Sequence, residues 1–252
     1  MIMQSRTTDR PPLIAVAHGS RDPRAAAAVE ALLHAVRLAE PGLDVRTAYL
    51  DHAPPSLPQA LSGLDQAVVL PLLLTAAYHS RVDIPAALRE TSARRPRLHI
   101  AYGDTLGPHP LLIAALERRL TEAGVTPGDP ETAVVLVSAG SSDARANAVI
   151  TRMAREWARA RPWWSVTAAF ASAASPTPAQ EVVRLIRTGA PKVVVAPYLL
   201  APGHFSDKVE RDTLEAGASV VAGVLGPAPE LVAIVQERYG QAVRRSTAVA
   251  TA

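Results

Sequence analysis

Short apolar runs alternate along the chain with segments in which apolar residues recur every three or four positions. The apolar runs predict strands, and the recurring spacing predicts helices with one buried face, as for Val29, Leu32 and Val36. The expected strands are at residues 13–17, 45–50, 67–74, 98–102, 133–138, 166–171, 193–200 and 220–225. Strands that alternate with helices favour parallel sheets with right-handed crossovers. We therefore expect an α/β protein of two similar Rossmann-like α/β/α lobes, each with a four-stranded parallel sheet.

The second half of the chain repeats the first half. The segment LGPHP at residues 106–110 recurs as LGPAP at residues 225–229, which is 119 positions later and identical at four of five residues. The loop after the first strand, residues 16–22, recurs at residues 137–143. Because repeated segments of this length are typical of duplicated structural units, each half is expected to form the same fold.

A segment rich in glycine and proline, residues 124–130, separates the two repeats. We place an N-terminal lobe at residues 11–125 and a C-terminal lobe at residues 131–245. Two similar lobes joined by a short link are expected to face each other across a cleft. Ligands of open parallel sheets bind beyond the carboxyl ends of the strands, so the loops after the strands should line this cleft.

Two histidines and a carboxylate follow the first three predicted strands. His18 follows the first strand, Asp51 follows the second, and His79 lies in the loop after the third. Adjacent parallel strands are about 5 Å apart, so these side chains can converge on one divalent ion. We therefore predict that the three residues form a metal and catalytic site. Each residue taken alone also fits an ordinary loop or turn position, and the role of Asp51 as ligand or base stays open.

The C-terminal lobe does not repeat this set of side chains. Ala139 and Ser172 stand at the first two corresponding positions, and only His204 repeats the third. The sequence therefore predicts a single metal site in the N-terminal lobe. The C-terminal lobe is expected to form the opposite wall of the cleft.

Hydroxyl and guanidinium groups lie beside the expected helix starts that face this cleft. Arginine side chains and helix N-termini both favour anionic groups, so this pattern indicates a cleft for an acidic ligand. The predicted binding residues are Ser20, Arg21, Ser80, Arg81, Ser141, Ser142 and His204. The competing interpretation is that the hydroxyl residues only cap helices.

Composition excludes several classes of protein. The 252 residues include no cysteine, which excludes disulfides, thiolate metal sites, iron–sulfur clusters and a thiol nucleophile. The net charge is only +3 and aromatic residues make up 4%, which disfavours nucleic-acid binding. No phosphate-binding or dinucleotide-binding glycine motif occurs. Without a targeting signal or a long apolar segment, we expect a cytoplasmic protein that does not bind membranes.

Four motifs resemble those of class II chelatases, in the group of sirohydrochlorin ferrochelatases and cobaltochelatases. They are VAHGSRDP at residues 16–23, YLD at residues 49–51, PLLLTAAYHSRVD at residues 71–83 and PYLLAPGH at residues 197–204. These motifs extend over nearly the whole chain, so the resemblance is to the long form with two lobes.

This resemblance implies insertion of a divalent ion into a reduced tetrapyrrole without ATP and without an organic cofactor. The histidines of the family's metal site map to His18 and His79, and this chain has Asp51 where a glutamate is common. The metal would be Fe²⁺ or Co²⁺, with Ni²⁺ also compatible, and the product would serve siroheme or cobalamin biosynthesis. The implied partners are sirohydrochlorin, or a related acidic tetrapyrrole, and the metal, bound by a monomer or weak homo-oligomer.

Two other functions fit the same residues. A metal or tetrapyrrole carrier would bind the macrocycle and would not accelerate metal insertion. A binding module for a small anion would have structural histidines and would show no metal dependence.

Overall fold

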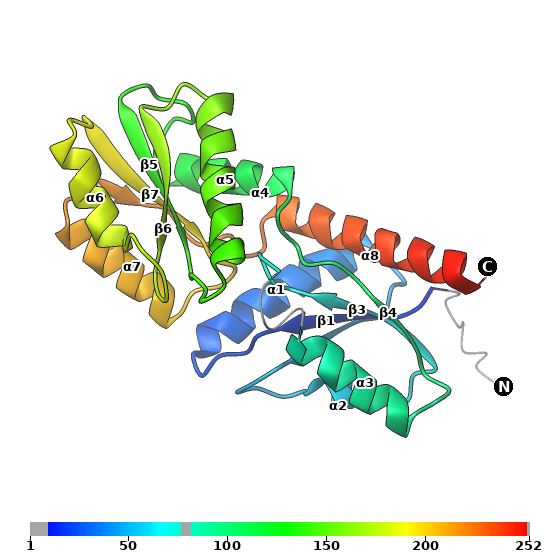
Figure 1. The fold of residues 1–252 in the computed structure, drawn as a ribbon. Helices are drawn as coiled ribbons and strands as arrows, with labels where there is room; N and C mark the ends of the chain where they lie inside the picture. Colours follow the sequence, from blue (N-terminus) through cyan, green and yellow to red (C-terminus); the bar gives the residue numbers. More distant parts are fainter. Residues whose placement is uncertain (1–9, 77–81, 251–252) are drawn as a thin grey trace.

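The computed structural model describes residues 10–76 and 82–250 and contains two α/β lobes (Figure 1). The first repeat consists of β1 Leu13–Ala17, α1 Pro23–Ala39, β2 Val45–Tyr49, α2 Leu57–Ala60, β3 Gln66–Pro71, α3 Ile84–Arg94, β4 His99–Tyr102 and α4 Pro110–Glu122. The second consists of β5 Thr132–Ser138, α5 Ala144–Ala160, β6 Ser165–Phe170, α6 Pro178–Arg187, β7 Lys192–Tyr198, α7 His204–Glu215, β8 Val220–Val221 and α8 Pro229–Ala250.

Both sheets have four parallel strands in equivalent orders. The order is β2-β1-β3-β4 in the N-terminal lobe and β6-β5-β7-β8 in the C-terminal lobe. Leu13 of β1 pairs with Val45 of β2 and with Val68 of β3, so the carboxyl ends of these strands reach the same edge. The predicted fold class of two α/β lobes with four-stranded parallel sheets is therefore confirmed.

Two strands end three or more residues before the apolar runs that predicted them do, and the other ends differ from the prediction by at most two residues. β3 ends at Pro71. The Leu72 amide still donates to the Val16 carbonyl of β1, but the Leu73 carbonyl accepts from the Leu106 amide, so the chain has turned away from β1. β8 includes only Val220–Val221, because the chain then leaves the regular pairing with β7. In both places the remaining apolar residues contribute to the core or the cleft, so a run of apolar residues overestimates the strand.

The two lobes exchange their last helices. α4 packs against β7 of the C-terminal sheet, whereas α8 packs against α1, β3 and β4 of the N-terminal lobe (Figure 1). α4 and α8 also pack against each other where the chain crosses between the lobes. The lobes in space therefore differ from the sequence halves 11–125 and 131–245 by one exchanged helix each. The sequence repeat could not reveal this, because periodicity gives a helix's apolar face and not the sheet that the face covers.

The exchange joins one face of each sheet in a continuous core. Leu13 from β1, Val134 from β5 and Ile234 from α8 belong to the same buried cluster. The opposite face of each sheet has its own smaller cluster, in which Ile14 packs with residues of α2 and α3, and Val135 packs with residues of α6 and α7.

Among residues 10–76 and 82–250, no helix is long and apolar enough to cross a membrane.

Candidate functional site

A cavity of about 580 Å³ lies between the carboxyl ends of the two sheets. The N-terminal lobe contributes residues 17–20 and 72–75 to its wall, and the C-terminal lobe contributes residues 138–142 and 198–201. Most of the lining is alanine, leucine, serine and glycine, and the described part of the wall contains no Arg, Lys, Asp or Glu. Cavities of this size and apolar character suit a small organic ligand.

The loop after β1 brings His18 and Asp51 next to each other. The Asp51 amide donates to the His18 carbonyl at 3.0 Å, which holds the two loop backbones together just beyond the ends of β1 and β2. Gly19 lies between them with φ of 92°, and a Cβ there would be 1.8 Å from the Asp51 carbonyl oxygen. Only glycine tolerates both this backbone conformation and this contact.

The structure places His18 on the exposed part of the cavity wall, whereas Asp51 is exposed and does not line the cavity. His79 lies outside the described residues, so the convergence of all three side chains on one metal stays a prediction. In the described parts of the chain, no group of three or more histidine, cysteine, aspartate or glutamate side chains could hold a metal ion. Any site formed by His18 and Asp51 therefore needs a further ligand from elsewhere.

The C-terminal lobe keeps the backbone of this loop and lacks its side chains. The Ser172 amide donates to the Ala139 carbonyl at 2.9 Å, as Asp51 does to His18. Gly140 has φ of 86°, and a Cβ there would be 1.9 Å from the Ser172 carbonyl oxygen. The two loops therefore share one geometry, and the side chains predicted to bind metal, His18 and Asp51, occur only in the N-terminal copy.

The predicted anion-binding residues fall into three groups. Ser20, Ser141 and Ser142 line the cavity. Arg21 and His204 are exposed, and neither lines the cavity. Ser80 and Arg81 lie outside the described residues.

Ser20 and Ser141 do not cap the helices as the competing interpretation expected, because the N-caps of α1 and α5 are Asp22 and Asp143. The Ser20 hydroxyl accepts a hydrogen bond from the Asp22 amide, and the Ser141 hydroxyl accepts one from the Asp143 amide, each at 3.0 Å. Both serines therefore hold the turn before a long helix while their residues face the cavity.

Asn147 is a cavity residue that the sequence analysis did not identify. Its side-chain oxygen accepts from the Ser141 amide at 3.0 Å, and its side-chain nitrogen donates to the Ser141 carbonyl at 2.7 Å. The corresponding residue of the first repeat is Ala26, which also lines the cavity. This difference between otherwise similar repeats is the one signal in the sequence that could have pointed to Asn147.

Tyr198 joins the two lobes at the base of the cavity. Its hydroxyl donates to the Leu74 carbonyl at 2.8 Å, across 124 positions of sequence. The side chain is almost fully buried, and burial raises the pKa of Tyr198 far above its ordinary value, so the hydroxyl stays protonated. Nothing local in the sequence indicates this contact, because a tyrosine at the end of an apolar strand is common.

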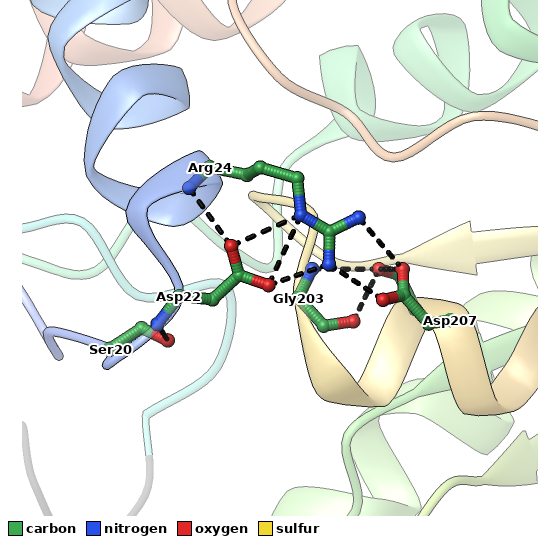
Figure 2. Close-up of polar contacts among 6 residues, drawn as sticks. Ser20, Asp22, Arg24, Gly203 and Asp207 are labelled. Carbon is green, nitrogen blue, oxygen red and sulfur yellow. Dashed lines mark hydrogen bonds and ion pairs between the residues drawn. The ribbon is translucent and has the colours of Figure 1, made fainter.

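Arg24 joins the two lobes through ion pairs (Figure 2), and its neighbour Ala25 lines the cavity. Its guanidinium binds Asp22 of its own lobe, with Nη2 to Oδ2 at 2.6 Å, and Asp207 of α7, also with Nη2 to Oδ2 at 2.6 Å. The hydrogen bonds with Arg24 lower the pKa of both carboxyl groups, and both carboxylates raise the pKa of Arg24. The three groups are therefore charged at neutral pH.

The repeated lobes, the exchanged helices and the shared cleft define a two-lobed α/β protein of the chelatase fold. A solved structure described as SirB from Bacillus subtilis with Fe³⁺ has the same fold, with a TM-score of 0.82 and 24% identity over 95% of this chain and 98% of that chain.

The chain belongs to the CbiX family, whose model matches residues 12–123 and again residues 133–242. A sirohydrochlorin cobaltochelatase of Priestia megaterium is 29% identical over 88% of this chain and 77% of that protein. A sirohydrochlorin ferrochelatase of the same organism is 27% identical over 84% of this chain and 82% of that protein. The similarity to the class II chelatases that the motifs indicated is thus confirmed.

Proposed function

We propose that this protein inserts Fe²⁺ or Co²⁺ into sirohydrochlorin without ATP, in siroheme or cobalamin biosynthesis. The observation that carries the proposal is the match of both halves to the CbiX family, whose relatives of similar length are named for both metals. The position of His18 on the wall of an apolar cavity between the lobes supports it. The proposal needs no organic cofactor, nucleic acid or membrane, and it treats the chain as a monomer or weak homo-oligomer.

The metal would enter the cleft on His18, His79 and Asp51. Neutral imidazoles and a carboxylate bind several divalent ions, so this set accepts iron, cobalt or nickel. Three protein ligands leave coordination positions open, which the pyrrole nitrogens can occupy in turn. The flat macrocycle would lie against the leucine and alanine side chains of the cavity, with its acidic groups toward the polar rim.

Insertion removes two protons from the pyrrole nitrogens as the metal–nitrogen bonds form. Asp51 or a histidine that has released the metal would accept these protons. Closure of the lobes could bend the ring and turn a nitrogen lone pair toward the metal. Ser20, Ser141 and Ser142 would orient the ligand, together with Arg21, Ser80, Arg81 and His204 outside the described cavity wall.

The test is an anaerobic absorbance assay of sirohydrochlorin with Fe²⁺ and, separately, with Co²⁺. We expect His18→Ala and His79→Ala each to abolish insertion while the protein stays folded. His34→Ala is the matched control, because His34 is an exposed residue of α1. Insertion at an unchanged rate in both ligand variants would refute the proposed site.

Asp51 has two proposed roles, which the insertion assay separates when it is combined with a titration of metal binding. Asp51→Asn keeps an oxygen that can bind metal weakly but removes the proton acceptor. If Asp51 is the base, the insertion rate falls and metal affinity is kept. If Asp51 is a ligand, metal affinity falls as well. Binding of sirohydrochlorin with no acceleration over the uncatalysed rate would instead identify a carrier.

A further inference from the structure

We propose that Arg24 selects acidic ligands at the rim of the cavity by exchanging the Asp207 carboxylate for a carboxylate of the ligand. The exchange would release the ion pair between the lobes as the ligand enters. Only the identity of the ligand, an acidic tetrapyrrole, rests on the proposed function. The assignment of the exchange itself depends on the contacts of Arg24, Asp22 and Asp207.

These contacts place Arg24 beside the cavity on both lobes. Asp22 is two residues from Ser20, which lines the cavity, and its amide donates to the Ser20 hydroxyl. Asp207 is two residues from Phe205, which lines the cavity from the other lobe. A Cβ on Gly203 would be only 3.9 Å from the Cβ of Asp22, so the two backbones are close at this point (Figure 2).

The two carboxylates hold Arg24 in different ways. Asp22 is the N-cap of α1, accepts from the Arg24 amide at 2.9 Å, and also binds the guanidinium through both oxygens. It therefore fixes Arg24 within its own lobe. Asp207 binds only the outer part of the guanidinium, with Nη1 to Oδ1 at 3.2 Å and Nη2 to Oδ2 at 2.6 Å. A ligand carboxylate can take the place of Asp207 and leave the contact with Asp22 intact.

The contact with Asp207 is of the kind that exchanges easily. The side chains of Arg24 and Asp207 are 52% and 50% exposed, and ion pairs at such positions contribute little to stability. The carboxylate of the ligand has the same charge and the same two oxygens as the Asp207 carboxylate that it replaces. Arg24 therefore keeps an equivalent ion pair when the ligand binds.

The charge of the described cavity wall gives Arg24 a distinct role. The described residues of this wall include no arginine or lysine, so the guanidinium of Arg24 beside it is a positive group available to an acidic ligand. The cluster of Asp22, Arg24 and Asp207 has a net charge of −1 and would repel such a ligand while Asp207 stays in place. Displacement of Asp207 makes the guanidinium available to the ligand, which couples entry of an anionic ligand to separation of the two rims.

A double-mutant cycle on ligand binding tests the exchange. Binding of metal-free sirohydrochlorin is titrated by absorbance for the unaltered protein, Arg24→Gln, Asp207→Asn and the double variant. We expect Asp207→Asn to tighten binding about three- to fivefold and Arg24→Gln to weaken it by a similar factor, as for the loss of one exposed ion pair. In the Arg24→Gln background, Asp207→Asn should have a clearly smaller effect, because only the repulsion by the Asp207 charge is then removed.

Asp212→Asn is the matched control, because Asp212 is on the same helix and pairs with Lys208 and Arg211. It should leave binding unchanged, and thermal unfolding checks that every variant is folded. Esterified sirohydrochlorin, which has no carboxylates, should bind all variants equally. Equal tightening by Asp207→Asn with and without Arg24 would overturn the proposal, because removal of a negative charge would then explain it.

The same samples separate this proposal from the proposed function. If the protein binds sirohydrochlorin with the expected cycle but inserts no metal, the proposed function fails and the exchange stands. If insertion is normal but binding is the same in all four proteins, the exchange alone is overturned. Absence of any binding by the unaltered protein would overturn both.

Discussion

Replacement of Tyr198 by phenylalanine should destabilise the protein as a whole, because the hydroxyl links the two lobes from a buried position. Tyr198 is 2% exposed, and its hydroxyl donates to the Leu74 carbonyl at 2.8 Å. The backbone of Gly107 also packs against the Tyr198 hydroxyl, since a Cβ at Gly107 would be 2.4 Å from the hydroxyl oxygen. Phenylalanine keeps the ring and its packing, so the change isolates one hydrogen bond.

The expected loss follows from the hydrogen bond that is removed. Leu74 is partly buried and lines the cavity, and a hydrogen bond of this kind contributes about 0.5–1.5 kcal/mol. For a chain of this length each kcal/mol lowers the Tm by about 2–4 °C, so the Tm should fall by about 1–6 °C. Because the core is continuous across the exchanged helices, calorimetry should still show one transition.

Tyr49→Phe is the matched control for this measurement. Tyr49 is also a buried tyrosine at the end of a strand on the cavity wall, and within the described residues its hydroxyl has no hydrogen-bond partner. We expect its free energy of unfolding to change by less than about 0.5 kcal/mol. If Tyr198→Phe is as stable as Tyr49→Phe in urea unfolding, the hydrogen bond between the lobes is not a significant source of stability.

Two further predictions concern the loop glycines and the exchanged helices. Gly19→Ala and Gly140→Ala should both lower the Tm, because each Cβ would lie within 2 Å of a carbonyl oxygen, at 1.8 and 1.9 Å. Only Gly19→Ala should also weaken binding of Co²⁺ in a metal titration, and an equal loss in both would argue against a metal site in the N-terminal lobe. Arg118 of α4 lowers the pKa of Glu230 of α8 below the usual 4.5, so this pair stabilises the fold above that pH and is lost as the pH falls through the lowered value. Glu230→Gln should therefore cost about 1 kcal/mol at pH 7 and progressively less below pH 4.5, and the same cost at pH 3 and pH 7 would contradict this account.

Local features of the sequence predicted the elements and the loop geometry well. Asp22 before Pro23 marked the start of α1, and its side chain does cap that helix. The repeat of HGS and AGS at residues 18–20 and 139–141 indicated two equivalent loops, and Gly19 and Gly140 have nearly the same φ. These predictions succeed because each depends on residues only a few positions apart.

Contacts between distant segments could not be predicted in the same way. Arg24 and Asp207 are 183 positions apart, and each alone resembles an ordinary exposed residue at a helix start. The pairing of Tyr198 with Leu74 and the packing of α8 on the N-terminal sheet depend on how the chain crosses between the lobes. The sequence therefore located the wall of the cleft at Ser20 and Ser141 and missed the groups that connect its two sides.

The helix exchange also determines how the protein could be divided. A cut in the link at residues 124–130 would leave the first fragment with α4, whose natural surface is on the other fragment, and would leave β3 and β4 without the cover of α8. Leu231, Ile234 and Val235 of α8 would then be exposed to water on the second fragment. Neither fragment should be stable by itself, whereas the two expressed together should associate and restore the complete cleft.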